Sequence, residues 1–426
     1  MRIAIIGGGI SGLTCGWLLH RHHDVTLFEG GERAGGHSNT VSAEYEGESQ
    51  SIDTGFIVCN DRTYPQFLAL LEQLDVTPVP TTMSFAVRCD KTGIEYCGSS
   101  LGGLFAQRSN IASPGFLRMI ADILRFNAAG MKDADQVSSD MTVAEYVRRK
   151  RFGSRFTDHY LYPMGAAIWS CPLGTFSEFP IAFILKFYRN HGLLQIRNRP
   201  QWYTIPGGSR TYVDRLIQPW DNSIRTRTPV KSVIRSENSV RVLTEASDET
   251  FDEVIFACHS DTALSLLDAP SQTEEEVLSA FPYEMNDVIL HADEQVLPRR
   301  RSAWAAWNYR IPQQEQQRPT VTYNMNILQH LKSRHTYCVT LNDADSIRSD
   351  RILSRHRYSH PVFSLSQSEM QGRHDDLIRA DRTSFCGAYW KNGFHEDGVA
   401  SATRVCRAFG IAGISGDESA ASGATA

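Results

Sequence analysis

Three features of the sequence predict an α/β fold that contains a doubly wound domain. An apolar run at residues 3–6 ends in the glycine motif GxGxxG at residues 7–12, and an apolar helical pattern follows directly. A second apolar run, residues 25–28, then ends in Glu29. Strand, tight turn, helix and strand in this order form the βαβ unit of a Rossmann-like domain. Alternating strand patterns between residues 286 and 358 predict a separate antiparallel sheet.

The residues of the glycine motif suit the binding of a dinucleotide. Gly7 permits the tight turn, Gly9 lets the backbone approach a pyrophosphate, and Gly12 lets the helix pack closely on the strand. Ser11 is counted as cofactor-binding too, because the amides at this helix N-terminus face the phosphates. Glu29 stands where a carboxylate accepts both hydroxyls of an adenosine ribose. We therefore predict a bound dinucleotide with a free 2′-hydroxyl; a merely glycine-rich turn is the alternative.

The composition is that of an ordinary globular protein and excludes some functions. The 426 residues are 41% hydrophobic and 21% charged, and the net charge of −5 gives no general attraction to nucleic acid. The nine cysteines are scattered without metal-ligand spacing, so we expect reduced thiols, a cytoplasmic location and no metal site. No stretch has the length and apolar character of a membrane span. The first strand begins at residue 2, which leaves no room for a removable leader.

The residues after Glu29 resemble a known signature. They read Arg33-x-Gly35-Gly36-His37, which is similar to the ExxxRxGG pattern of the superfamily of flavin amine oxidases and polyene desaturases. The resemblance implies FAD as the cofactor, held non-covalently because no cysteine or histidine stands in the family's usual attachment context. It implies that Gly35 and Gly36 pass close to the FAD and that Arg33 lies near its phosphates. His37 replaces the arginine usual in the family and is counted as cofactor-binding.

Further motifs follow in the order found in that superfamily and extend the resemblance over nearly the whole chain. They are D-x-G at residue 53, Pro-Gly-Gly at residue 206, and F-x-G followed by G-F-x-E at residues 385–396. Ala388 stands where the family usually has a glutamate, and a plain turn is the alternative interpretation of D-x-G. The cofactor-binding residues that the resemblance implies here are Asp53, Gly55, Phe56, Pro206, Gly207, Gly208, Val230, Gly387, Gly393, Phe394, His395 and Glu396.

More narrowly, the segments PMGAAIWS (163–170), NHGLLQ (190–195) and GAYW (387–390) resemble those of a bacterial subgroup of NAD/FAD-binding, amine-oxidase-like proteins. Its members are often encoded beside methyltransferases similar to cyclopropane-fatty-acid synthases. Some are implicated in desaturating methylated acyl chains toward furan fatty acids. This resemblance implies a fatty-acyl substrate, which residue spacing alone does not indicate.

Residues 111–131 are the most apolar helix candidate, with the helix starting after Pro114. Its broad apolar stripe is accompanied by Arg118 and Arg125, whose long side chains can reach past it to water. Core packing is the interpretation we favour, and peripheral contact with a membrane surface is the alternative. The stripe consists of Phe116, Leu117, Ile120, Ile123 and Leu124.

Apolar and aromatic residues near the cofactor motifs are the candidates for the substrate side. Flavin chemistry needs a C–H bond held near the flavin in a site shielded from water. Lysine is scarce, so a lysine-assisted amine oxidase is less favoured than an enzyme acting on an alkyl chain. We predict that residues 111–131, residues 163–170 and the Tyr389-Trp390 loop line the cavity over the flavin. For Tyr389 and His395, packing against the cofactor is the alternative role. The candidate substrate-binding residues are Ile168, Trp169, Trp307 and Tyr309, and the candidate catalytic residues are Tyr389, Trp390 and His395.

Together these features predict a Rossmann-like FAD-binding domain with an inserted α+β substrate domain, made of an antiparallel sheet plus helices. Residues 1–60, 200–262 and 378–414 are assigned to the first, residues 61–199 and 263–377 to the second, and residues 415–426 to a disordered tail. We expect an oxidoreductase that removes a hydride from a C–H bond of a hydrophobic or lipid substrate, in particular a desaturase of a methylated fatty-acyl chain. A flavin amine oxidase, a redox-neutral flavin isomerase and a non-enzymatic flavin-binding module are the alternatives. The electron acceptor cannot be identified from the sequence.

Overall fold

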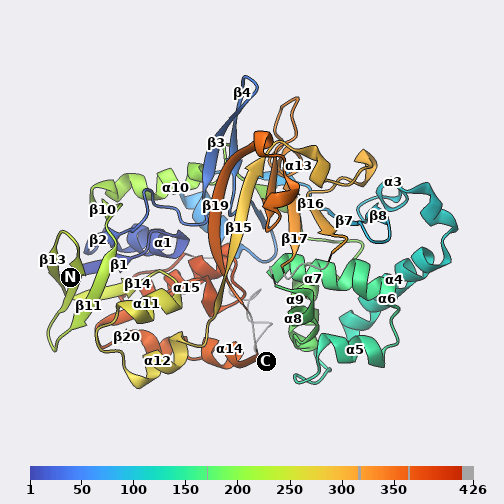
Figure 1. Ribbon diagram of the computed structural model, residues 1–426. Helices are drawn as coiled ribbons and strands as arrows, with labels where there is room; N and C mark the ends of the chain where they lie inside the picture. Colours follow the sequence, from blue (N-terminus) through green and yellow to red (C-terminus); the bar gives the residue numbers. More distant parts are fainter. Residues whose placement is uncertain (170, 315–317, 363–364, 415–426) are drawn as a thin grey trace.

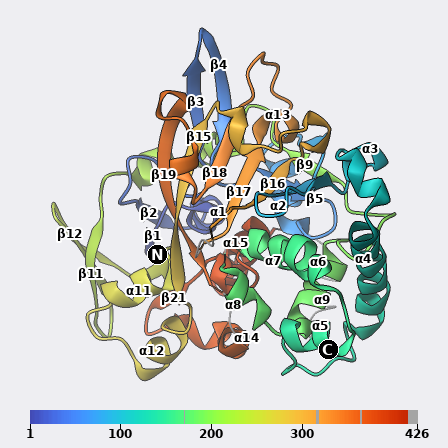
Figure 2. The ribbon, with the colours of Figure 1, turned by 45° about the vertical axis from the view of Figure 1, so that its right-hand side comes forward.

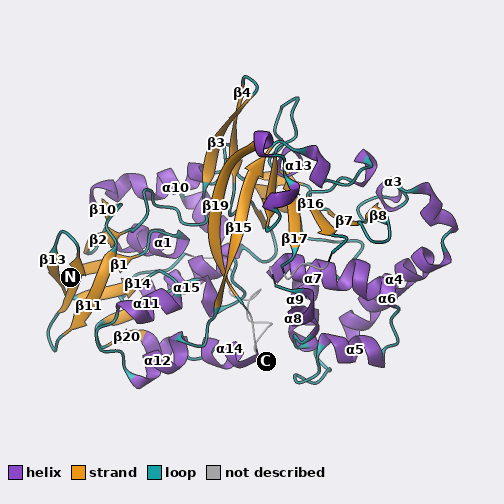
Figure 3. Ribbon diagram, viewed as in Figure 1, coloured by secondary structure: helices purple, strands orange, loops and turns teal. Residues whose placement is uncertain are grey.

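The computed structural model describes residues 1–169, 171–314, 318–362 and 365–414. Figure 1 shows a six-stranded sheet on the left, a seven-stranded sheet in the centre and a group of helices on the right. Figure 3 shows the same division by secondary structure, with helices on the right, strands in the centre, and strands together with helices on the left. Ser170 and the predicted tail, residues 415–426, lie outside the described residues. The residue ranges assigned to two domains stay a prediction.

The six-stranded sheet is the doubly wound part that the sequence predicts. The apolar runs at residues 3–6 and 25–28 become neighbouring parallel strands, and β14 pairs in parallel with the other side of β1. The strand β21 extends the parallel sheet, and β20 pairs with it antiparallel. The sheet order is β10 (Ile224–Arg225), β2 (Asp24–Phe28), β1 (Arg2–Ile6), β14 (Glu253–Phe256), β21 (Thr383–Phe385) and β20 (Ile378–Ala380).

Apolar side chains cover both faces of this sheet, because successive residues of a strand point to opposite sides. Ile3 and Ile5 pack with helices on one face, and Ala4 and Ile6 pack on the other. The first face is covered by α1 (Ile10–Leu19), α2 (Pro65–Gln73), α10 (Arg210–Ile217) and α15 (His395–Arg407). The second is covered by a three-stranded sheet, β11 (Val230–Arg235), β12 (Val240–Thr244) and β13 (Asp248–Phe251), and by α11 (Ser260–Leu266) and α12 (Gln272–Leu278).

The seven-stranded sheet is antiparallel, as predicted, except where β7 runs parallel to β16. The sequence patterns do not predict β7 or β8. Within the region of alternating patterns, the strand β16 begins only at Trp307, because residues 301–303 form a 3₁₀ turn and the Asn308 side chain bonds to the backbone of Ala305. The order is β19 (Ile352–Pro361), β15 (Tyr283–His291), β18 (Cys338–Leu341), β17 (Thr320–Asn324), β16 (Trp307–Ile311), β7 (Phe85–Cys89) and β8 (Glu95–Cys97).

The helical region packs around one apolar cluster that also takes in Tyr309 and Val321 of the seven-stranded sheet. The helix expected at residues 111–131 begins at Pro114 and extends to Asp133. Among the helices of the described part of the chain, none has the length and apolar character that a membrane span needs. The helices are α4 (Pro114–Asp133), α5 (Val143–Arg149), α6 (Ser154–Phe156), a π-helical turn (Thr157–Leu161), α7 (Tyr162–Trp169), α8 (Leu173–Ser177) and α9 (Ile181–Asn190).

Smaller elements join these regions. A hairpin is formed by β3 (Thr40–Tyr45) and β4 (Glu48–Asp53). A three-stranded sheet consists of β5 (Val58–Asn60), β9 (Trp202–Thr204) and β6 (Val79–Thr81). The remaining α-helices are α3 (Leu101–Leu104), α13 (Met325–Leu328) and α14 (Leu365–Gln371). The 3₁₀ turns are η1 (Arg108–Ala112), η3 (Gln218–Ser223), η4 (Glu294–Val296), η5 (Arg301–Ala303), η6 (Ala344–Ser346), η7 (Ser349–Arg351), η8 (His374–Leu377) and η9 (Ala388–Trp390).

Candidate functional site

The glycine motif forms the turn between β1 and α1. Gly7 has a φ of +107°, and a Cβ on it would lie 2.8 Å from the carbonyl oxygen of Ala257. A Cβ on Gly12 would collide with the carbonyl oxygen of Gly7, so helix and strand approach this closely only with glycine. At Gly9 a Cβ would have no neighbour within 4 Å among the described residues. The open space beside Gly9 is what the approach of a pyrophosphate to the backbone requires.

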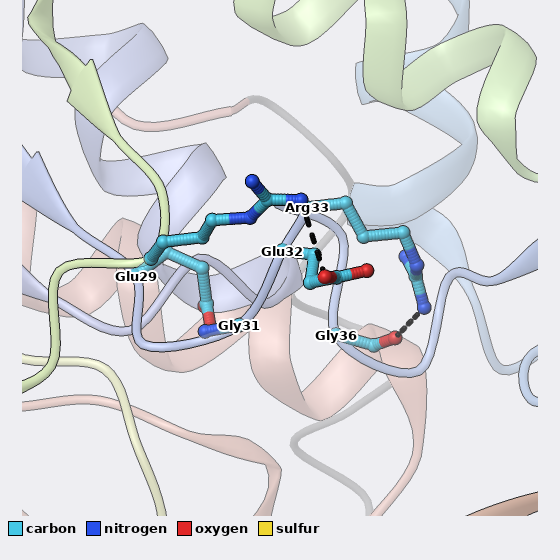
Figure 4. Close-up of a pocket in the computed structure, with 6 residues that line it drawn as sticks. Glu29, Gly31, Glu32, Arg33 and Gly36 are labelled. Carbon is cyan, nitrogen blue, oxygen red and sulfur yellow. Dashed lines mark hydrogen bonds and ion pairs between the residues drawn. The ribbon is translucent and has the colours of Figure 1, made fainter.

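Glu29 lies at the end of β2, beside this turn. Its carboxylate accepts the backbone N–H of Gly8 at 2.7 Å and that of Gly31 at 2.6 Å. A carboxylate has about four lone-pair positions, so it can still accept hydroxyl groups. Figure 4 shows the cavity of about 510 Å³ beside it, lined by Glu29, Gly31, Glu32, Arg33, Gly36 and Arg227.

Arg33 shapes the loop that closes this cavity. Its guanidinium donates to the backbone carbonyls of Gly36 and Ser38, each at 3.0 Å, and the bond to Gly36 is drawn in Figure 4. Burial lowers the pKa of Arg33, but a guanidinium stays charged. The hydrogen bonds that the structure gives Arg33 therefore hold the loop.

The two glycine-containing segments that follow in the sequence meet beside the turn. A Cβ on Gly36 would lie 3.0 Å from the Cα of Gly9, and a Cβ on Gly55 would collide with the carbonyl oxygen of His37. Ser11, on the first turn of α1, would lie 2.9 Å from a Cβ on Gly398 of α15. The predicted R-x-G-G and D-x-G segments and the start of α15 thus converge on the glycine motif.

Asp53 holds the Pro206-Gly207-Gly208 segment in place. Its buried carboxylate accepts the Thr40 hydroxyl at 2.6 Å and the Ser209 backbone N–H at 2.9 Å. It also accepts from the Gln329 amide at 3.2 Å, so a residue next to α13 joins the network. Burial raises the pKa of Asp53 to about 6, against the hydrogen bonds from Thr40 and Ser209. Asp53 therefore positions the loop that contains Pro206, Gly207 and Gly208. Val230 is on another element, at the start of β11.

His395 is the first residue of α15. Its ring stacks on Phe56, with the centroids 3.8 Å apart and 11° between the planes. Its Nε2 lies 2.7 Å from the Tyr212 hydroxyl and 3.3 Å from the Ser38 hydroxyl. Burial lowers the pKa of His395 to about 3, so the imidazole is neutral at neutral pH. This geometry suits a residue that positions the start of α15.

Two buried carboxylates fix the loop around Gly393 and Phe394. Glu396 accepts the N–H of Phe67 at 2.8 Å at the N-terminus of α2, where backbone donors lack helical partners. Asp397 accepts the N–H of Phe394 at 2.9 Å. Burial raises the pKa of Glu396 to about 7 and that of Asp397 to about 6. In this structure Glu396 connects α15 to α2.

The four predicted substrate-binding residues come together in the apolar cluster of the helical region. Trp169 packs in an aromatic group with Phe187, at a centroid distance of 4.8 Å. Phe187 stacks in turn on Phe394 at 5.6 Å, and Phe394 also packs against the core of the six-stranded sheet. Phe394 therefore links this cluster to a cofactor motif. The cluster includes Ile168, Trp169, Trp307, Tyr309 and the α4 residues Phe116, Met119 and Phe126.

Comparison with known proteins identifies the family. Residues 10–312 match the flavin-containing amine oxidoreductases, which is well over half of the chain. The chain belongs to this family. No curated protein matches the sequence.

Several solved structures share the fold of this flavin-containing amine oxidoreductase. The CLA-producing fatty acid isomerase from P. acnes superposes with a TM-score of 0.67 at 15% identity, covering 96% of this chain and 98% of that one. Cyclohexylamine oxidase from Brevibacterium oxydans IH-35A gives 0.68 at 14% identity, with 96% and 98% covered. Putrescine oxidase gives 0.66 at 12% identity, with 96% and 99% covered. These likenesses confirm the predicted fold class.

The protein is thus an FAD-dependent oxidoreductase, and its residues fit the cofactor. Gly9 leaves room for the pyrophosphate, and Glu29 keeps free lone pairs beside a cavity that would hold the adenosine ribose. When bound, FAD accepts the hydride that leaves the substrate. Within the described residues, no group of three or more His, Cys, Asp or Glu side chains is arranged to hold a metal ion.

Two of the predicted catalytic residues lie apart from the predicted substrate-binding residues. Tyr389 and Trp390 are buried in the apolar cluster on the second face of the six-stranded sheet. The Trp390 indole N–H donates to the carbonyl of Phe385 at 3.2 Å, and its ring stacks on His374 at 4.1 Å. The structure therefore does not bring them together with Ile168 and the rest of its cluster, and we leave them out of the proposal below.

Sequence reasoning missed His191, which lies where the apolar cluster meets Phe394. Its ring stacks on Phe187 at 3.8 Å and lies 5.8 Å from the Phe394 ring. Its Nδ1 lies 3.0 Å from the Phe187 carbonyl, so Nδ1–H donates and Nε2 is left as an acceptor. Burial lowers the pKa of His191 to about 4. The segment NHGLLQ, which resembles that of the bacterial subgroup, was a signal in the sequence, and Gly192 has a φ of +68° in the structure.

His37, which replaces the family's usual arginine, belongs to a group of histidines. Its ring lies 5.2 Å from that of His360 and 6.5 Å from that of His259. Burial lowers the pKa of His37 well below its ordinary value, and the neighbouring histidines act in the same direction. Near neutral pH His37 is therefore uncharged, unlike the arginine usual at this position in the family.

Proposed function

We propose that this oxidoreductase acts on a hydrophobic substrate, in particular a methylated fatty-acyl chain, which it desaturates. One carbon would lose its hydride to FAD, and the neighbouring carbon would lose a proton to solvent, so that a C=C double bond remains in the chain. The observation that supports this proposal is the apolar cluster around Ile168, Trp169 and Trp307, which reaches the cofactor motif at Phe394. Burying an alkyl chain there would contribute about 0.8 kcal/mol per methylene.

Two titratable groups in and beside the cluster, His191 and Tyr309, also fit a neutral substrate better than an amine. Burial lowers the pKa of His191 to about 4, and burial raises the pKa of Tyr309 above its ordinary value. Both side chains are therefore uncharged near neutral pH. Neither supplies the negative charge that would pair with a substrate ammonium.

Anaerobic mixing tests the substrate class, because reduction bleaches the flavin. Bleaching by a methylated acyl substrate and not by alkyl amines is the expected result. Bleaching by amines alone would identify an amine oxidase, and a shifted double bond without net bleaching would identify an isomerase. Ile168→Glu should abolish acyl turnover while the flavin spectrum persists, and Ile168→Leu should retain turnover as the matched control. Loss of FAD from Ile168→Glu would show that Ile168 serves the cofactor or the fold.

We also propose a cytoplasmic location with peripheral membrane contact through residues 111–131. All nine cysteines are free in the structure, which is typical of proteins in a reducing compartment. Labelling of thiols in protein taken directly from cells checks this, since disulfides would contradict it.

A further inference from the structure

The helix α4 carries a second apolar face that points away from the protein. Its buried face packs Phe116, Met119 and Phe126 into the apolar cluster. On the opposite side Leu117, Leu124 and Met131 are 45%, 47% and 40% exposed. They stand seven residues apart, which is close to two helical turns, so they share one face. The alanines at 121 and 128 are exposed between them.

Basic residues accompany this apolar stripe. Arg118, Arg125 and Lys132 each follow one of its large members and are exposed. Asp122 is buried and pairs with Arg125 at 2.5 Å and with Arg118 at 3.9 Å. No carboxylate of α4 is therefore exposed between residues 114 and 132. We call Leu117, Ala121, Leu124, Ala128 and Met131, with Arg118, Arg125 and Lys132, the α4 outer face.

The surroundings of the helix extend this surface. In Figures 1 and 2 α4 lies at the outer edge of the helical region. Leu101 of α3 and Ile111 of η1, which precede α4 in the sequence, are 77% and 57% exposed. Arg148 and Arg149 at the end of α5 are exposed as well, and so is Glu145 in its first turn. Apolar side chains grouped with basic ones are the composition by which helices lie on the surface of anionic membranes.

We propose that the α4 outer face docks this protein on the surface of an anionic phospholipid bilayer. The leucines and Met131 would enter the boundary between headgroups and acyl chains, and the basic side chains would face the lipid phosphates. A second copy of this chain fits less well, since pairing two such faces would bring the same arginines and lysine close together.

The position of α4 gives the docking a use, which rests on the proposed function. The inner face of the helix belongs to the same apolar cluster as Ile168 and Trp307. A bilayer on the outer face would therefore lie one helix away from the side chains proposed to hold the acyl chain. An acyl substrate could then pass from membrane to enzyme without crossing water.

Co-sedimentation of the FAD-loaded protein with vesicles tests the docking. We expect binding to vesicles of phosphatidylcholine mixed with phosphatidylglycerol, and much weaker binding to phosphatidylcholine alone. About 1 M sodium chloride should release the protein, because the screening length then falls to about 3 Å. Replacing Arg118 and Lys132 by glutamine should weaken binding about tenfold or more, since each basic residue contributes about fivefold near such a surface.

The apolar part is tested with the pair Leu117→Gln and Leu124→Gln in one protein, which should also bind at least about tenfold less. Met285→Gln is the matched control, because Met285 is 43% exposed on β15. Equal vesicle binding by the wild type and the Leu117→Gln/Leu124→Gln variant would overturn the proposal. So would the absence of wild-type binding to both kinds of vesicle. If sedimentation velocity shows that the wild type is a dimer and the Leu117→Gln/Leu124→Gln variant is a monomer, the α4 outer face binds a second copy of the chain instead.

Turnover of a detergent-dispersed acyl substrate separates the two proposals. It should be unchanged in the Leu117→Gln/Leu124→Gln variant. The structure exposes these two members of the predicted apolar stripe, and they are not part of the apolar cluster proposed to bind substrate. Vesicle binding without acyl turnover in the wild type would refute the proposed substrate and support the docking. Acyl turnover without vesicle binding would support the proposed substrate and refute the docking.

Discussion

Replacing Gly9 by alanine is expected to change the stability of the apoprotein and its affinity for FAD in opposite directions. Gly9 has a φ of −73° and a ψ of −178°, which alanine adopts readily. A Cβ there would have no neighbour within 4 Å in the described part of the chain. The free energy of unfolding of the apoprotein should therefore rise by about 0.4–1 kcal/mol, because alanine restricts the unfolded chain more than glycine does.

The affinity for FAD should fall about 10- to 100-fold in the same variant. The added methyl group would occupy the space through which the pyrophosphate approaches the backbone, and losing one hydrogen bond to a charged group costs about 1.5–3 kcal/mol. Flavin fluorescence during titration of the apoprotein measures the affinity, and urea unfolding measures the stability. Gly12→Ala is the contrasting variant, since its Cβ would collide with Gly7 and should destabilise the apoprotein itself. Unchanged FAD affinity in Gly9→Ala, or a less stable apoprotein, would refute the assignment of Gly9 to the pyrophosphate.

Acid precipitation of the purified protein should leave yellow flavin in the supernatant, because we expect non-covalent FAD; flavin in the pellet would show a covalent bond. Glu29→Ala should weaken FAD retention during dialysis by about 1–3 kcal/mol, since the ribose loses a charged acceptor. Glu32→Ala, an exposed change in the same cavity, is its control, and equal retention in both would argue against the assignment. Burial raises the pKa of Glu396 to about 7, so the folded protein holds a proton that the unfolded chain releases, and stability falls as pH rises from about 4.5 to about 7. In Glu396→Gln this decrease in the free energy of unfolding should be smaller by up to about 3 kcal/mol. Urea unfolding of the wild type and the variant at about pH 5 and about pH 8 measures the decrease, and an equal decrease in both proteins would disprove the assignment to Glu396.

Elements defined by local patterns could be predicted from the sequence, and elements defined by distant partners could not. The strands at residues 2–6 and 24–28 and the helix between them follow from apolar spacing and three glycines. The strand at residues 85–89 was missed because it is short and pairs in parallel with residues 307–311, more than two hundred positions away. Nothing in the intervening sequence indicates a parallel pair inside an antiparallel sheet.

The candidate site shows the same limit at the level of atoms. The pattern around Glu29 identified residues that the structure places around one cavity. The sequence pattern could not show that the Arg33 guanidinium donates hydrogen bonds to loop carbonyls. Nor could it show that the Glu396 carboxylate accepts hydrogen bonds from the start of α2. Trp390 was expected to face the substrate because it lies near the cofactor motifs, but its stacking partner is His374, on a segment that contains no motif.

The order of strands in the six-stranded sheet also bears on how the protein is made. The strand β1 precedes its neighbour β14 by about 250 residues, and β21 pairs with β14 only at residues 383–385. At about 5–20 residues per second, synthesis of the chain from β1 to β21 takes on the order of a minute. During this time the six-stranded sheet that supports the glycine turn is incomplete. FAD capture is therefore expected only after nearly the whole chain has emerged, and nascent chains halted before residue 383 should not retain flavin.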